Sequence, residues 1–447
     1  MSPIVIKAAQ FLLSLSLLII LHEMGHFLPA KWFKTRVEKF YLFFDVKFSL
    51  FKKKIGETEY GIGWLPLGGY VKISGMIDES MDTEAMKEEP KEWEFRSKPA
   101  WQRLIIMLGG VTVNFLIAFL IYIFASFYYG DTDISTKSLK DGYSVENSVL
   151  TDIGFQTGDN IVSIDGVSYE NYSDLRKNLI TANQITVERD GELKTIVLPQ
   201  DFLGKLSTSN ERTFFEIRHP FVVSMVSDSS ANKNADLMEG DVFLALNGQE
   251  LKYFDQYQDK LASLQGQEVI ATISRDGQKK EITLKVSDDG KFGIYPGGTY
   301  QQFEELGYLA IIQKKYGLLE SIPVGATKFV NQITGYGAQL KKIFTPSTGA
   351  YKGVGGFKAI FDIFPSTWSW QAFWSITALL SIMLAVLNLL PIPALDGGHV
   401  MFLMYEIISG RKPSDKFLEN AQMVGFFLLL ALILFANGND IYKAIFK

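Results

Sequence analysis

Two histidines and a glutamate stand close together near the start of the sequence, in the order His22-Glu23-Met24-Gly25-His26. On a helix, four residues advance about 400°, so the two imidazoles lie about 40° apart on one face. Both rings can then reach one zinc ion at about 2.0–2.1 Å, and Glu23 is close enough to take a proton from metal-bound water. This spacing predicts a hydrolytic metal centre with Glu23 as general base.

A catalytic zinc ion of this kind takes three protein ligands and leaves one position open. The chain has no cysteine and only four histidines, so the third ligand is a carboxylate or another imidazole. Asp396 is the favoured candidate, since it lies in a Pro- and Gly-rich break after an apolar stretch. His399 is the competing ligand, and Asp396 as a plain helix cap is the non-catalytic alternative. The structural residues of the predicted break are Pro391, Pro393, Gly397 and Gly398.

Apolar segments are the elements that must position these residues. They are Ala8–Leu21, Leu104–Phe127, Ala372–Leu390 and Met423–Ala436. The second and third can cross a hydrocarbon core of about 30 Å, whereas the last is short and needs flanking residues from Phe417 onward. Buried helices of a soluble domain are the alternative for the first and last. A glutamate at membrane depth costs at least about 2.5 kcal/mol, which favours a functional Glu23. We predict an α-helical polytopic membrane protein with about four transmembrane helices.

Positive charges predict the orientation of these helices. Lysines and arginines gather after the first segment, before the second, and between the third and fourth, for example Lys31, Lys34 and Arg411. The positive-inside rule puts these loops in the cytoplasm. Both termini and the region of about 131–370 then lie outside, and the predicted metal centre lies near the cytoplasmic side.

The outer region contains an internal repeat. Thr157–Gly166 matches Glu239–Gly248, and Val187–Gly191 matches Ile273–Gly277. Each copy indicates a strand, an Asp-Gly or Asn-Gly turn and alternating apolar residues, a pattern that resembles PDZ domains. Such domains bind peptide termini or strands by edge addition. The predicted boundaries are 1–130 and 371–447 for the membrane domain, 131–218 and 219–300 for two extracytoplasmic PDZ-like α+β domains, and 301–370 for a linker.

HEMGH, the segment NLLPIPALDGGH and the tandem modules together resemble the site-2 protease family of intramembrane zinc proteases, nearest its bacterial RseP branch. The resemblance implies that His22, His26 and Asp396 bind one zinc ion per chain and that Glu23 is the general base. It also implies that Asn388 helps to hold the substrate.

The same resemblance assigns residues 60–72 to a membrane-associated β-hairpin, within about 55–75, whose edge pairs with extended substrate. An ordinary cytoplasmic hairpin is the alternative. Asn114 matches the family's Gly-Pro-x-x-Asn motif, with Val111 in place of the proline, and otherwise predicts a helix–helix contact. The substrate-binding residues implied for the hairpin are Gly61, Gly63, Leu65, Gly68, Gly69 and Tyr70.

The resemblance implies regulated intramembrane proteolysis in a bacterial cytoplasmic (inner) membrane. The expected substrates are single-span membrane proteins such as anti-sigma factors or remnant signal peptides, which the PDZ-like domains filter or dock by their C-termini. A non-enzymatic scaffold with a relic motif and a divalent-metal transporter are the other classes. The formal net charge of -5 gives no reason to expect nucleic acid as a partner.

Overall fold

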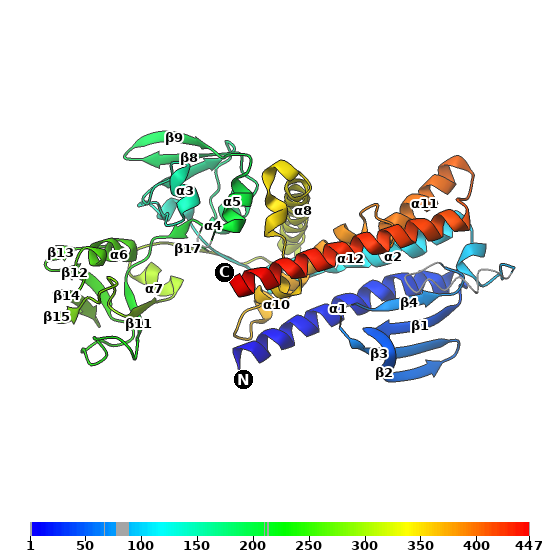
Figure 1. Ribbon diagram of the computed structural model, residues 1–447, viewed down its shortest axis with the longest axis horizontal. Helices are drawn as coiled ribbons and strands as arrows, with labels where there is room; N and C mark the ends of the chain where they lie inside the picture. The colour runs from blue at the N-terminus through cyan, green and yellow to red at the C-terminus, as the bar shows by residue number, and fades with distance from the viewer. Residues whose placement is uncertain (1, 67, 77–88, 210, 212–213, 447) are drawn as a thin grey trace. The chain divides into compact units, whose positions relative to one another are not determined.

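The computed structural model describes the chain except residues 1, 67, 77–88, 210, 212–213 and 447 (Figure 1). The chain forms two compact units. We call them the helical unit and the sheet unit. The helical unit comprises Met1–Gly130, Lys315–Ala338 and Val354–Lys447, and the sheet unit comprises Asp131–Lys314 and Gln339–Gly353.

Four helices of the helical unit, counted over the described residues, are long and apolar enough to cross a membrane. They are α1 (Pro3–Trp32), α2 (Ala100–Tyr128), α10 (Trp370–Asn388) and α12 (Asp415–Phe446). The predicted set of four apolar helices is therefore confirmed. The fourth is much longer than its apolar stretch, because the helix continues through polar residues at both ends. Helix α2 runs unbroken through Val111, the position where the family motif has proline.

Helix α2 lies against both α1 and α10. The crossing with α1 depends on glycine: a Cβ on Gly25 would strike the backbone of Gly109, and a Cβ on Gly109 would strike that of Gly25. Small residues of this kind let membrane helices approach closely. Helix α11 (Asp396–Ser409) is joined to α2 by a partly buried ion pair of 2.5 Å between Arg103 and Glu406. The helices that carry the predicted metal ligands are thus both anchored on α2.

A small sheet follows α1 in the chain. Its strands are β1 (Val37–Leu42), β2 (Phe44–Ile55), β3 (Thr58–Leu65) and β4 (Tyr70–Ile73), arranged in the order β2-β3-β1-β4. Strand β1 therefore separates β3 from β4, and the prediction of a simple hairpin over 60–72 is wrong. The reason is that residues 37–42, which lie in the segment predicted as a cytoplasmic loop, form a strand between β3 and β4. Strand β4 forms one edge of the sheet and contacts α1.

The segment 301–370, expected as a linker, contains regular structure that is divided between the units. Residues up to Lys314 belong to the sheet unit, and Lys315–Ala338 belongs to the helical unit. Within the helical unit, Phe329 of this segment packs edge-on against Phe115 and Phe119 of α2. The elements of this segment are α7 (Tyr300–Glu305), β17 (Ile311–Lys314), α8 (Leu318–Ile343) and α9 (Phe357–Asp362).

The sheet unit contains two modules that follow the internal repeat. The first module has β5 (Asp131–Ile134), β6 (Tyr143–Ser144), α3 (Ser148–Asp152), β7 (Asn160–Ile164), α4 (Tyr172–Leu179), β8 (Gln184–Arg189), β9 (Glu192–Val197), α5 (Phe202–Thr208) and β10 (Glu216–Ile217). The second has β11 (Val222–Val226), β12 (Val242–Leu246), β13 (Gln249–Glu250), α6 (Phe254–Ala262), β14 (Glu268–Arg275), β15 (Gln278–Lys285) and β16 (Ile294–Gly297). Strands β7-β8-β9 with α4 correspond to β12-β14-β15 with α6.

The repeated Gly-Asp and Arg-Asp-Gly signatures meet in space as the same ion pair in both modules. Asp159 pairs with Arg189 at 2.6 Å, and Asp241 pairs with Arg275 at 2.7 Å. Both carboxylates are almost fully buried, with exposed fractions of 0% and 1%. Each pair ties the start of one strand to the end of its neighbour, which explains why both signatures recur together in the sequence.

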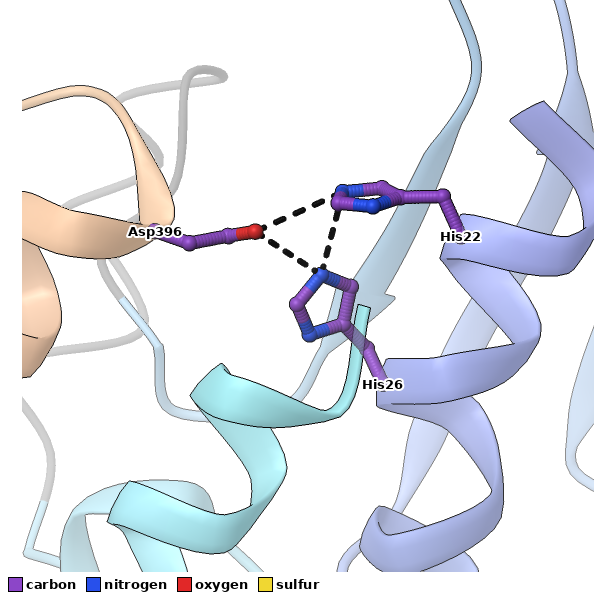
Figure 2. Close-up of side chains that lie close together, drawn as sticks. All are labelled: His22, His26 and Asp396. Atoms are coloured by element: carbon purple, nitrogen blue, oxygen red, sulfur yellow. Dashed lines mark hydrogen bonds and ion pairs between the residues drawn. The ribbon is translucent and has the colours of Figure 1, made fainter. Parts of the chain in front are cut away.

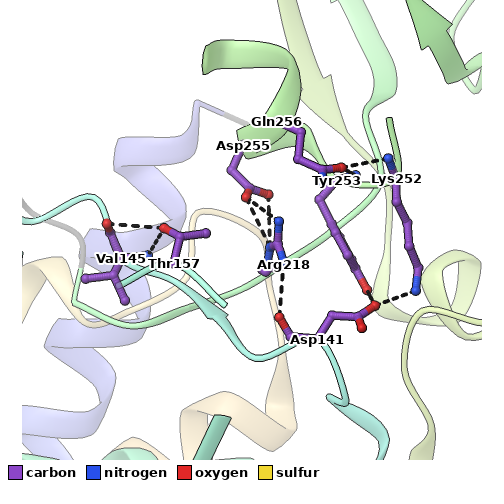
Figure 3. Close-up of polar contacts among 8 residues, drawn as sticks. All are labelled: Asp141, Val145, Thr157, Arg218, Lys252, Tyr253, Asp255 and Gln256. Atoms are coloured by element: carbon purple, nitrogen blue, oxygen red, sulfur yellow. Dashed lines mark hydrogen bonds and ion pairs between the residues drawn. The ribbon is translucent and has the colours of Figure 1, made fainter. Parts of the chain in front are cut away.

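A polar cluster joins the two modules within the sheet unit (Figure 3). The Arg218 guanidinium donates to the Asp255 carboxylate at 2.7 Å and to the Asp141 carbonyl at 3.1 Å. It also lies over the Tyr253 ring, 4.2 Å from its centroid. The Asp141 carboxylate accepts hydrogen bonds from Lys252 and Tyr253. Hydrogen bonds from Lys252 and Tyr253 hold the pKa of Asp141 below its ordinary value.

The Asp241–Arg275 pair gives a test of the second module. Replacing Asp241 by asparagine leaves Arg275 without its buried partner. We expect the free energy of unfolding of this module to fall by about 3 kcal/mol, at the low end for a broken buried pair. Burial alone raises the pKa of Asp241, but hydrogen bonds from Arg275 and the Met238 N–H outweigh it, so the pKa is lowered. The pair therefore stabilises fully above the unfolded pKa of about 3.9 and stops stabilising as the pH falls through the folded value.

Urea-dependent proteolysis of the full chain, followed from neutral pH into acid, measures this contribution. The control is Asp276→Asn, which makes the same change at an exposed turn residue with φ of 52° that asparagine also tolerates. Equal stability of D241N and D276N at neutral pH would contradict the assigned role of the pair.

Candidate metal centre

Three side chains from α1 and α11 converge on one point (Figure 2). His22 and His26 lie one turn apart on α1, and Asp396 is the first residue of α11. Oδ2 of Asp396 is 3.4 Å from Nε2 of His22 and 3.3 Å from Nε2 of His26, and the two Nε2 atoms are 3.4 Å apart. Both histidines are buried. The structure thus brings together the residues that the sequence proposed as ligands.

This geometry fits a divalent metal ion. A tetrahedral zinc with bonds of about 2.0–2.1 Å separates its ligand atoms by about 3.3–3.4 Å, which matches the three measured distances. Oδ2 of Asp396 is also buried and has no donor in hydrogen-bonding geometry among the described residues. An anionic oxygen in that position is satisfied by a cation. Two imidazoles and one carboxylate form a donor set that suits zinc and leaves a fourth position for water.

The connection between α10 and α11 puts Asp396 in place. Helix α10 ends at Asn388, two prolines follow, and Ala394 takes a positive φ of 81°. A Cβ on Gly397 or Gly398 would collide with carbonyl groups of this connection, so glycine is required where α11 begins. The Ala394 N–H donates to the side chain of Gln422 on α12 at 3.1 Å. Asp396 is therefore the first residue of the helix and not its N-cap, which is Leu395, and its carboxylate lies beside the two histidines.

Further polar groups surround the two imidazoles. Nδ1 of His26 lies 2.8 Å from the carbonyl oxygen of Ile106, and Nδ1 of His22 lies 3.0 Å from Nδ2 of Asn114. Nδ2 of Asn388 lies 3.3 Å from Nε2 of His22. The structure thus places Asn388 beside the ligand cluster, where a bound peptide could contact it.

A cavity of about 600 Å³ opens next to the three ligands. Glu23 lines it together with Val71 of β4. His399 also lines the cavity but does not belong to the three-residue ligand group. Apolar side chains, including Ile19 and Leu384, complete the wall. The cavity therefore combines a general base, a metal-ligand cluster and an apolar surface.

The predicted substrate-binding residues separate into two groups. Gly68, Gly69 and Tyr70 line the cavity with the rest of β4. The other three residues do not line the cavity. They are Gly61, Gly63 and Leu65, and they lie on β3, which β1 separates from β4.

Sequence reasoning missed Lys39 and Asp45, which line the same cavity. Asp45 accepts a hydrogen bond of 2.8 Å from the Tyr70 hydroxyl and lies 3.4 Å from the Lys39 ammonium. Lys39 lies on β1 and Asp45 lies on β2. The alternation of polar and apolar residues over 45–50 was the signal that could have revealed β2, whereas residues 37–42 of β1 do not alternate.

Comparison with protein families gives one match across nearly the whole chain. The model of peptidase family M50 matches residues 10–432. Alignments with individual proteins also cover nearly the whole chain. The chain is 27% identical to a protein of Vibrio cholerae named "Putative zinc metalloprotease", over 98% of this chain and 99% of that one. It is 26% identical to the "Regulator of sigma-E protease RseP" of Salmonella typhimurium, over 98% and 99%. The "Regulator of sigma E protease" of Haemophilus influenzae is 26% identical, over 97% and 98%.

The ligand set can be tested by zinc binding alone. Asp396→Asn removes the anionic ligand, and we expect zinc affinity to fall by more than the about 10–100-fold typical for loss of a supporting contact. His399→Gln changes the competing candidate in the same cavity and should leave the affinity nearly unchanged. Competition with a chelating dye on purified full-length chain measures both. A larger loss of zinc affinity in H399Q than in D396N would show that His399, and not Asp396, is the third ligand.

Proposed function

The chain belongs to peptidase family M50 and is a membrane zinc metalloprotease, and on this premise we propose that it hydrolyses peptide bonds within or beside transmembrane segments. The observation that carries the proposal is the position of the cluster. His22, His26 and Asp396 share a cavity with Glu23, and the helix that holds the two histidines is apolar enough to span a membrane. Family membership favours this enzyme over a scaffold or a metal transporter.

Glu23 moves the protons of the proposed reaction. Zinc, when bound by the three ligands, lowers the pKa of a water molecule and polarises the scissile carbonyl. The Glu23 carboxylate takes a proton from the attacking water as the C–O bond forms. It then gives that proton to the leaving nitrogen as the C–N bond breaks. The Asn388 amide, beside His22, is in position to donate to the substrate.

The edge of β4 is the proposed site of substrate capture. A helical substrate hides its carbonyl groups, so the segment to be cut must first unwind. Among the described residues, strand β4 pairs with β1 and with no other strand, and its residues Tyr70, Val71 and Lys72 line the cavity. An unwound segment that pairs with this edge gains backbone partners beside Glu23.

The sheet unit is proposed to restrict or dock substrates. A cleft of about 660 Å³ lies between its two modules, lined by Arg176 of α4, His219 at the module junction and aromatic residues such as Tyr300. Glu216 also lines the cleft, so one cation and one anion stand among aromatic side chains, a lining that suits an extended peptide with apolar side chains. The charge distribution supports an inner-membrane location with this unit and both termini outside and the catalytic cavity near the cytoplasm. Single-span anti-sigma factors and remnant signal peptides are the proposed substrates.

Glu23→Gln tests the chemistry directly. The amide keeps the size of the side chain but cannot accept the water proton, so we expect cleavage of a co-reconstituted single-span substrate to fall by about 10²–10⁴-fold. Zinc content should stay at the wild-type value, because Glu23 is not one of the three ligands. The control is Glu57→Gln, the same change at an exposed position outside the cavity. Undiminished cleavage by E23Q would rule out the assigned base.

Gly69→Ala tests the placement of β4. A Cβ at this position would strike Ile19 of α1 and the Tyr41 carbonyl, so the strand must shift relative to Glu23. A displacement of about 1 Å near reacting groups can cost about 10²-fold in rate, and we expect kcat/KM to fall by up to that factor with zinc retained. Gly337→Ala, at a helical glycine with open space around it, is the matched control. Equal rates for both variants would count against capture by β4.

A further inference from the structure

The two metal-ligating histidines use the same ring nitrogen and turn the other one toward α2. Nε2 of each ring faces Asp396, at 3.4 Å for His22 and 3.3 Å for His26. The opposite nitrogen, Nδ1, meets the Ile106 carbonyl in one case and the Asn114 amide in the other. One helix therefore contacts both rings from behind.

A neutral imidazole carries a single proton on one of its two nitrogens. When Nε2 binds a metal ion, that proton is on Nδ1 and needs an acceptor, which also fixes the orientation of the ring. For His26 the acceptor is the Ile106 carbonyl oxygen, 2.8 Å away. For His22 the group in contact with Nδ1 is the side-chain amide of Asn114, so the acceptor must be its Oδ1.

The amide of Asn114 has an unused acceptor. Its Nδ2 faces Nδ1 of His22 at 3.0 Å, which matches the tautomer with the proton on Nε2. Its Oδ1 is fully buried and has no hydrogen-bond partner among the residues that the structure describes. A half-turn of the amide exchanges the two atoms, gives Oδ1 a donor, and matches the tautomer in which Nε2 is free to bind metal.

We infer that Asn114 is a positioning residue of the metal centre: its side-chain oxygen accepts the Nδ1 proton of His22 and so selects Nε2 as the metal-binding atom. This inference rests on the zinc-dependent function proposed above. It adds to the three metal ligands a residue that does not touch the metal and acts through His22.

The alternative is that Asn114 only holds two helices together. The structure assigns that contact to a different atom: the backbone carbonyl of Asn114 accepts the hydrogen bond of 2.7 Å from Ser381 of α10. The side chain is left to face α1. Gly110, one turn earlier, allows this approach, because a Cβ there would strike both imidazole rings. The contact with α10 therefore does not use the amide, which is free to contact His22.

Three variants separate the two roles. Asn114→Leu has a similar size and no acceptor, Asn114→Asp keeps only acceptors, and Ser381→Ala removes the helix–helix hydrogen bond without touching a histidine. We expect N114L to lower zinc affinity by about 10–100-fold. N114D should bind zinc as tightly as the wild type or more tightly. S381A should lose thermal stability in the metal-free protein and keep its zinc affinity.

The measurements are zinc competition with a chelating dye and the visible absorption of the Co²⁺-substituted full-length chain, which reports the ligand geometry. Wild-type affinity and spectrum in N114L would overturn the inference. If N114L does not fold, N114D decides: a loss of zinc affinity there overturns the inference, because an acceptor is present. A wild-type chain with no zinc affinity overturns the proposed function as well, so the two failures are distinguishable.

Discussion

A membrane interior offers no water to satisfy polar groups, and this constraint governs the helical unit. Its buried polar side chains find partners on neighbouring helices: Ser14 of α1 bonds to Thr377 of α10 at 2.9 Å, and Ser381 bonds to the backbone of α2. A few buried oxygens have no hydrogen-bond partner among the described residues, and the Oδ2 atom of Asp396 is the one that belongs to a carboxylate. The carboxylate and the two imidazoles around it are a stable arrangement when a cation joins them, so the fold and the metal depend on each other.

The close approach of α1 and α2 is the geometric condition for this centre. Gly25 and Gly109 meet with no room for a Cβ, which brings the backbone of α2 directly behind the histidine rings. Ile106 can then contact Nδ1 of His26, and Asn114 can contact Nδ1 of His22. A larger residue at the crossing would separate the helices and remove these contacts, although no metal ligand would have changed.

The sequence identified the residues whose chemistry is local. The spacing of His22 and His26 needs only a helix, and the proline and glycine break before Asp396 indicates irregular backbone within an apolar region. Strand β1 could not be recognised in the same way, because its charged residues follow a membrane helix and resemble a loop. The role inferred for Asn114 was also inaccessible, since a motif does not show which atom of the residue contacts which helix.

The proposed reaction requires one cavity both to hold an unwound substrate segment and to cut its peptide bond. Unwinding a substrate helix at membrane depth exposes backbone groups, and each unsatisfied group costs several kcal/mol. An open strand edge is normally a liability, because it offers unpaired donors and acceptors to any passing chain. In this fold β4 lines the cavity that contains Glu23. The edge can therefore satisfy the groups that unwinding exposes at the place where the peptide bond is cut, so binding energy from the strand contributes to making the bond accessible.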